Sequence, residues 1–130
     1  MAAWTSAELG KIAATDELRI ASRRRDGTLN SPRIIWVVRI GDDVYVRSVN
    51  GRGSAWFRGT QVRREGNIQA GGVSKDVTFA DPGDDLGDQI DAAYRAKYRP
   101  YAASIIDHIT SPQARAATIR LVPRSPAEGD

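Results

Sequence analysis

Two groups of side chains in this sequence have the types and spacing that bind a small molecule. The first is a basic run, Arg23-Arg24-Arg25, which leads into an Asp26-Gly27 turn. The second places arginine, hydroxyl, amide and indole groups around a glycine-rich loop, and its members are Arg47, Ser48, Asn50, Gly51, Ser54 and Trp56. Guanidinium groups match the geometry of phosphate and carboxylate, and an indole stacks on planar rings. The pattern indicates a cradle for a flat, anionic ligand.

Each of these residues also has a plain structural explanation. Arg24 and Arg25 would suit a solvated hairpin tip, and Arg47 would suit an edge strand that a charge protects from aggregation. Trp56 would fill a small core beneath the loop. Residues 51–53 are too short for a dinucleotide fingerprint and do not match a P-loop. The residues themselves leave both explanations open.

The composition excludes several kinds of chemistry. The 130 residues contain no cysteine and one histidine, His108, which excludes disulfide frameworks, thiolate ligands, cysteine nucleophiles and multi-histidine zinc sites within one chain. The aspartates of residues 81–88 lack the spacing of a calcium loop and would instead complement the start of the next helix. We therefore expect no metal. No acid–base motif is present, so the catalytic residues remain unassigned.

Charge and hydropathy limit the partners and the location. The net charge is +3, with a basic bias toward arginine, and no continuous basic stripe runs along the chain. Nucleic acid is therefore not favoured as a partner. No apolar run is long enough to cross a bilayer, and the N-terminus has no signal pattern, so we expect no membrane association and a cytoplasmic protein.

Periodicity and turn residues predict an α+β protein. The most informative segment is residues 33–40, which is apolar on both faces and therefore typical of a central strand with a barrel interior on one side and a helix or partner subunit on the other. The other predicted elements are a helix from about residue 6, strands over 17–24, 43–49, 66–70, 73–80 and 117–122, a short edge strand at 62–64, a helical turn at 54–58, and helices over 86–99 and 101–109.

This order of elements favours a small antiparallel barrel with helices packed to one side. Residues 1–123 are predicted to form a single domain, and residues 124–130 a polar C-terminal tail.

A resemblance to a known superfamily rests on several motifs. These are Arg24-Arg25-Asp26-Gly27, Pro32, the hairpin of residues 36–49, Asn50-Gly51 and Ser54-Ala55-Trp56-Phe57. They resemble the split β-barrel proteins that bind flavins and deazaflavins, which include the pyridoxamine-phosphate-oxidase-like proteins, and are most similar to small deazaflavin-dependent nitroreductases. From Trp4 to Pro123 the chain looks most like an uncharacterised bacterial family within that superfamily. The resemblance implies a split barrel with flanking helices.

The resemblance also implies which residues of the first half bind a cofactor. Arg24 and Arg25 match a basic pair that contacts cofactor phosphate or carboxylate groups. Pro32 matches the proline that begins the cofactor-facing strand, and Trp36 and Val37 match the segment whose backbone borders the ring. Trp36 is bulkier than the usual residue, so its indole would compete with the ring for space.

The loop after the hairpin completes the implied set. Ser48 to Gly51, with Asn50 between them, match the strand end near the phosphate-bearing tail, and Ser54 and Trp56 match the turn that closes over the cofactor. Asp26 departs from the pattern, because it places a carboxylate where a serine is common.

Two functions of different class follow. The resemblance implies binding of a small planar anionic cofactor, FMN or a deazaflavin, with nitroreductase-like oxidoreductase activity on an unassigned substrate and a pocket completed across a homodimer. The alternative is a non-enzymatic module that keeps the barrel without the cofactor and binds an anionic or nucleic-acid partner. A yellow protein favours the first function, and a colourless one with salt-dependent nucleic-acid binding favours the second.

Overall fold

The chain begins with a helix whose start is set by reciprocal capping. In α1 (Ser6–Ala14), the Thr5 hydroxyl accepts a hydrogen bond from the Glu8 amide, and the Glu8 carboxylate accepts one from the Thr5 amide. The computed structural model describes residues 3–83 and 85–124. The tail expected over residues 124–130 therefore lies outside the described residues beyond Arg124.

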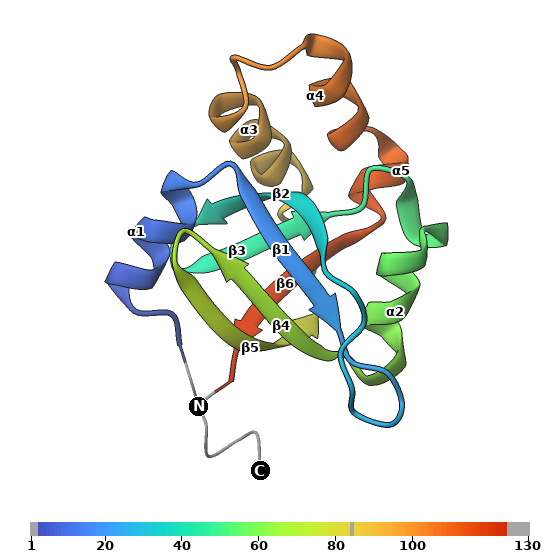
Figure 1. Cartoon of the computed structure of the whole chain (residues 1–130). Coiled ribbons are helices and arrows are strands. Elements are labelled where there is room, and N and C mark those ends of the chain that lie inside the picture. Colours follow the sequence, from blue (N-terminus) through green and yellow to red (C-terminus); the bar gives the residue numbers. More distant parts are fainter. Residues whose placement is uncertain (1–2, 84, 125–130) are drawn as a thin grey trace.

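Six antiparallel strands form a closed barrel (Figure 1). They are β1 (Glu17–Ser22), β2 (Arg33–Ile40), β3 (Asp43–Arg47), β4 (Glu65–Ala70), β5 (Val73–Ala80) and β6 (Thr118–Pro123). The order around the barrel is β1-β2-β3-β6-β5-β4, and β4 pairs back with β1. The predicted fold class, an antiparallel barrel with flanking helices, is confirmed.

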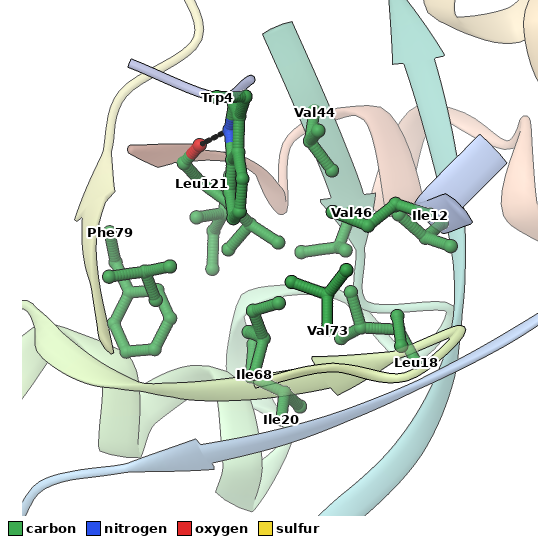
Figure 2. Close-up of a cluster of buried hydrophobic side chains, with 14 of the residues drawn as sticks. Trp4, Ile12, Leu18, Ile20, Val44, Val46, Ile68, Val73, Phe79 and Leu121 are labelled. Carbon is green, nitrogen blue, oxygen red and sulfur yellow. Dashed lines mark hydrogen bonds between the residues drawn. The ribbon is translucent and has the colours of Figure 1, made fainter. Parts of the chain in front are cut away.

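The barrel interior is a continuous apolar core (Figure 2). Helix α1 contributes Leu9 and Ile12 to it, and α2 (Ala55–Arg63) contributes Phe57. The Trp4 indole Nε1 donates a hydrogen bond to the Leu121 carbonyl, 3.0 Å away, so this buried polar atom has a partner. The two helices lie on opposite sides of the barrel in Figure 1, so the expectation that the helices pack to one side is wrong.

The outer face of β2 and β3 carries a second apolar layer. It consists of Val38, Tyr45, Ile90, Tyr94, Tyr98 and Ile109, which come from the two strands, from α3 (Gly87–Lys97) and the residue after it, and from α4 (Ala103–Ile109). Val37 points into the barrel core instead. The expectation of a barrel interior on one face of β2 and a helix on the other is met at Val37 and Val38, where helices of the same chain cover the outer face, whereas Arg33 and Ile34 at the start of the strand are exposed.

One predicted element is wrong. Residues 62–64 were expected to form an edge strand, but α2 continues through Arg63, and Arg64 ends it in a left-handed conformation with φ 56°. Ser54 caps the helix by accepting a hydrogen bond from the Phe57 amide, so the predicted turn at 54–58 is the first part of a nine-residue helix. Residues 112–115 also form a short helix, α5 (Pro112–Arg115).

Strand β2 changes its neighbour halfway along its length. Its residues 33–36 pair with β1, whereas its residues 37–40 pair with β3. Strand β3 ends one residue beyond the Val37–Val46 pair, at Arg47, which pairs on the other edge of β3 with Thr118 of β6. Among the described residues, the β3 side of residues 33–36 therefore has no strand partner.

The Tyr98 side chain replaces a strand partner where the β1–β2 ladder ends. Its hydroxyl accepts a hydrogen bond from the Val37 amide at 3.0 Å and donates to the Asp16 carbonyl at 2.6 Å. The ring is fully buried. A buried backbone amide without an acceptor is costly, so this hydroxyl stabilises the strand junction.

We expect Tyr98→Phe to lower the free energy of unfolding by about 1–3 kcal/mol, because the Val37 amide loses its acceptor. Urea denaturation measures this difference. Tyr101→Phe is the matched control: that hydroxyl contacts only the Asp16 carboxylate from an exposed position, so its removal should change stability by about 0.5 kcal/mol or less. Equal losses in the two variants would show that the strand junction does not depend on Tyr98.

Candidate functional site

A cleft of about 380 Å³ lies along the unpaired edge of β2. We call it the edge cleft, and its lining residues are Ile34, Ile35, Trp36, Arg47, Val49, Trp56, Tyr101, Ile105 and Ile109. Ile35 packs against the barrel core, whereas Trp36 packs against the outer layer. Because side chains from both faces of the strand line the cleft, it follows the strand edge.

The backbone of β2 presents polar groups to this cleft. Ile40 and Asp43 flank a two-residue turn and are therefore a hydrogen-bonded pair. Alternation along an antiparallel strand then directs the N–H and C=O groups of Ile34 and Trp36 to the same side, beyond the end of β3. The Trp36 carbonyl already accepts a hydrogen bond from the Tyr94 hydroxyl, 3.5 Å away. The Val37 amide, which bonds to Tyr98, faces the opposite edge as this alternation requires.

Aromatic side chains form one wall of the edge cleft. The Trp36 ring stacks on Tyr98, with centroids 3.8 Å apart and planes at 5°, and Tyr101 meets it at a tilt with a centroid distance of 5.0 Å. The cleft has its volume with the indole in place, so Trp36 narrows the space without filling it. Tyr101 and Ile105 at the cleft mouth are each more than one third exposed.

A second pocket, of about 360 Å³, adjoins the edge cleft. Its lining residues are Ile20, Ser22, Arg24, Asn30, Ser31, Arg33, Ala55, Trp56, Gly59 and Thr60, and we call it the basic pocket. Trp56 lines both spaces. The two cavities therefore meet at one indole, with aromatic and aliphatic groups on one side and two guanidinium groups on the other.

Arg24 and Arg33 are engaged differently in the basic pocket. The Arg24 guanidinium bonds to its own loop, at the Thr28 hydroxyl (3.2 Å) and the Leu29 carbonyl (3.0 Å). Arg33 is exposed, and its side chain makes no hydrogen bond or ion pair with another residue in the described part of the chain. The sequence analysis did not identify Arg33 as a site residue. Its position directly after Pro32, on the strand that carries Trp36, could have indicated it.

Several predicted site residues line neither space. Arg25 is exposed, and its carbonyl accepts a hydrogen bond from Arg63. Pro32 is exposed and directly precedes β2. Val37 is buried in the barrel, and its carbonyl accepts a hydrogen bond from the Lys97 amine at 2.7 Å. Asp26 bonds to Thr28 within its own turn, which lowers the pKa of its carboxyl.

The loop that begins at Ser48 connects β3 to α2 through contacts within the protein. The buried Ser48 hydroxyl lies 2.7 Å from that of Ser54, and Ser54 caps α2. Asn50 is exposed at the start of a 3-10 turn, Gly51–Gly53. Gly51 has φ 80°, and a Cβ there would lie 2.5 Å from the Gln113 side chain. Packing against α5 therefore explains the glycine.

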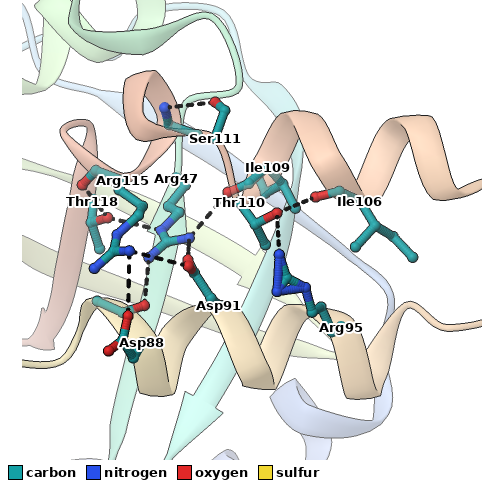
Figure 3. Close-up of polar contacts among 12 residues, drawn as sticks. Arg47, Asp88, Asp91, Arg95, Ile106, Ile109, Thr110, Ser111, Arg115 and Thr118 are labelled. Atoms are coloured by element: carbon teal, nitrogen blue, oxygen red, sulfur yellow. Dashed lines mark hydrogen bonds and ion pairs between the residues drawn. The ribbon is translucent and has the colours of Figure 1, made fainter.

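Arg47 is a buried connector between β3 and the helices (Figure 3). Its guanidinium pairs with Asp91 and donates to the Thr118 hydroxyl at 2.9 Å and to the carbonyls of Ile109 and Gly87 at 3.1 and 3.2 Å. Arg47 was expected to be either a cation that faces a groove or an exposed charge on an edge strand, and both expectations are wrong. Part of the residue borders the cleft, but its side chain is 0% exposed and its N–H donors bond to other residues of the protein.

The comparisons with known proteins agree with this architecture. Residues 8–121 match the family described as "Uncharacterized protein conserved in bacteria (DUF2255)". The chain belongs to this family. The prediction of an uncharacterised bacterial family with a split-barrel fold is confirmed. No curated protein matches the sequence.

Three solved structures share the fold. HutZ, the heme storage protein from Vibrio cholerae, has a TM-score of 0.66 and 15% identity over 92% of this chain and 90% of that chain. An F420 reductase has a TM-score of 0.62 and 12% identity, covering 89% and 92% of the two chains. An FAD-binding protein from Mesorhizobium loti has a TM-score of 0.52 and 16% identity, covering 95% and 93%. At these identities the likeness establishes the fold alone.

Residues 3–83 and 85–124 contain no helix long and apolar enough to span a membrane. The same residues contain no group of three or more histidine, aspartate or glutamate side chains arranged to hold a metal ion.

We expect Arg47→Met to lower the free energy of unfolding by about 3–5 kcal/mol, because it leaves the Asp91 carboxylate poorly exposed and without its main partner. Arg115→Met is the matched control: it also pairs with Asp91, but from a side chain that is 42% exposed, so its loss should be about 1 kcal/mol or less. Chemical denaturation compares the two. Adding Asp91→Leu should restore part of the stability of the Arg47 variant but not of the control, and equal effects in both would contradict the connector role.

We expect Lys97 to make stability depend on pH. Burial lowers the pKa of its amine from 10.5 to about 8, partly opposed by the charge of Asp16. Between these values the unfolded chain binds more protons, so the contribution of this side chain to stability rises as the pH rises from about 8 toward 10.5. Urea denaturation at pH 7.5 and 9.5 should show the wild type gaining stability relative to Lys97→Met. If the stabilities of the wild type and Lys97→Met changed with pH in parallel, burial would not lower the pKa of Lys97.

Proposed function

We propose that this protein binds a planar, anionic redox cofactor of the flavin or deazaflavin class, with the ring in the edge cleft and the phosphate-bearing tail in the basic pocket. The observation that carries the proposal is the junction of the two spaces at Trp56. Each space has the volume typical of part of a small-molecule site, and together they pair an aromatic, apolar end with a basic end. That polarity matches a ring with a charged tail.

The edge cleft suits the ring on two grounds. The indoles of Trp36 and Trp56 offer stacking surfaces, and the Trp36 ring is held in place by its stack on Tyr98. Flavin and deazaflavin rings carry carbonyl and N–H groups along one side. The unpaired N–H and C=O groups of β2 at Ile34 provide complementary partners, as a strand edge does for another strand.

The basic pocket suits the phosphate. Arg33 has an uncommitted guanidinium, and Arg24 adds a second positive charge from the neighbouring loop. Ser31 and Asn30 line the same pocket and add hydroxyl and amide groups. Charge-assisted hydrogen bonds of this kind are among the strongest available to a protein. Of the residues implied by the superfamily resemblance, Arg24, Trp36 and Trp56 line these two spaces and remain in the proposed site.

The residues of this chain would bind the cofactor and orient it. A bound cofactor of this class supplies electron transfer itself, whereas the protein positions it and controls access. Tyr101, Ile105 and Val49 at the cleft mouth exclude water from one side, and they are the exposed apolar surface that a second copy would cover in a homodimer. From the resemblance to deazaflavin-dependent nitroreductases, we propose a nitroreductase-like oxidoreductase activity with an unassigned substrate.

The names of the structural neighbours support the flavin class over heme. Two of the three neighbours described above are named for F420 and FAD. The third is named for heme storage, but the single histidine of this chain, His108, is exposed on α4 and lines neither space. The fit of the residues therefore favours a flavin or deazaflavin.

Titration of the purified protein with FMN and with a deazaflavin, followed by ring absorbance and tryptophan fluorescence, tests the proposal. We expect saturable binding of at least one, and about tenfold or greater weakening in Arg33→Gln, which removes a charged hydrogen-bond donor. Trp36→Leu should weaken binding and reduce the spectral shift. Arg25→Gln is the matched control, because it removes the same charge from the same end of the molecule outside the pocket.

Absence of binding to either compound at high micromolar concentration would overturn the proposal. Equal weakening by Arg25→Gln and Arg33→Gln would indicate general electrostatic attraction without the proposed pocket. A colourless protein with salt-dependent binding to nucleic acid would then favour the non-enzymatic module.

A further inference from the structure

Another basic cavity lies outside both spaces of the proposed cofactor site. It has a volume of about 400 Å³, and its lining residues are Arg23, Gly27, Arg63, Glu65, Gly66, Asp76 and Arg124. We call it the arginine cavity. It shares no lining residue with the edge cleft or the basic pocket. Within the basic run of the sequence, Arg24 therefore lines one cavity and Arg23 another.

The arginine cavity gathers three guanidinium groups from separate segments. Arg23 follows β1, Arg63 ends α2 and Arg124 follows β6. They face two carboxylates: Glu65 lies 3.3 Å from Arg63 and 2.7 Å from Arg124, and Asp76 lies 3.8 Å from Arg23. The hydrogen bond and charge of Arg124, together with Arg63, lower the pKa of Glu65, so Glu65 is ionised at neutral pH.

Two of the guanidinium groups are held in place by backbone carbonyls. Arg23 donates to the Gly27 carbonyl at 2.6 Å, and Arg63 donates to the Arg25 carbonyl at 3.2 Å. These bonds use one terminal nitrogen of each arginine, Nη1, and leave the other terminal nitrogen, Nη2, with a carboxylate. The donors are therefore arranged before any ligand arrives, which reduces the entropy cost of binding.

The carboxylate contacts at this site are weak enough to be replaced. The side chains of Arg23, Arg63 and Asp76 are 29%, 40% and 52% exposed, and ion pairs at such positions contribute little stability. At 3.8 Å, the Arg23–Asp76 contact is longer than a hydrogen bond. An oxyanion with several oxygens can satisfy two guanidinium groups at once.

We propose that the arginine cavity binds a phosphate group, either as free phosphate or as the phosphoryl end of a small metabolite, between Arg23 and Arg63. The cavity volume is ample for a phosphomonoester. This site is independent of the cofactor site and does not require the proposed function to be correct.

Calorimetric titration with inorganic phosphate, against sodium chloride at matched ionic strength, tests the proposal. We expect saturable binding that weakens about tenfold or more in Arg23→Gln and in Arg63→Gln but is unchanged in Arg39→Gln, which removes an exposed guanidinium that lines none of the three cavities. Arg63→Lys keeps the charge and loses the planar fork, so it should bind with intermediate affinity. Circular dichroism confirms that each variant is folded.

The possible outcomes separate the two sites and the two ligand sources. Tighter binding of glycerol phosphate than of inorganic phosphate assigns the site to a phosphoryl ester, and the reverse assigns it to free phosphate. Absence of saturable phosphate binding overturns the proposal, as does binding lost only in Arg33→Gln. The FMN and deazaflavin titrations should be unaffected by Arg63→Gln, so failure of the cofactor proposal and failure of this one can be told apart.

Discussion

The change of neighbour within β2 is the constraint on which the rest of the structure depends. Every buried backbone amide and carbonyl needs a partner, and a strand that leaves one neighbour for another exposes an edge on each side of the change. On the β1 side the Tyr98 hydroxyl meets this need at Val37. On the β3 side the edge of residues 33–36 opens into a cleft. The same departure from regular pairing thus explains both a buried tyrosine and the candidate site.

The buried Arg47 determines where the outer wall of that cleft stands. A guanidinium removed from water must be surrounded by acceptors, and here they come from α3, from the end of α4 and from β6. The Ile109 carbonyl is one of them, so the end of the helix that carries Ile105 is tied to β3. A charge that the sequence suggested for ligand binding instead positions the helix that borders the site.

Arginine serves three purposes in this small protein. Arg47 connects secondary-structure elements from a buried position, Arg33 is uncommitted beside the edge cleft, and Arg23 belongs to a partly exposed cluster with carboxylates. Burial and the supply of nearby acceptors, which differ at each position, separate these purposes. The arginine count alone therefore carries little functional information, whereas the position of each guanidinium carries much.

The sequence by itself determined the features that depend on near neighbours along the chain. Alternation in residues 33–40 placed Val37 and Trp36 on opposite faces, Thr5 and Ser54 marked helix starts, and glycine turns marked the hairpins. The error at residues 62–64 arose because a short charged segment carries little periodic signal, and only the continuing helix identifies it.

Only the tertiary structure decided which side chains line the candidate sites. Arg47 is buried because Asp91 and Thr118 lie beside it, and Arg33 and Trp56 line one pocket although they come from β2 and α2. Such partners are tens of residues away in the chain. Their placement depends on strand pairing and helix packing, which local periodicity does not specify, because the same alternating pattern is compatible with several neighbours.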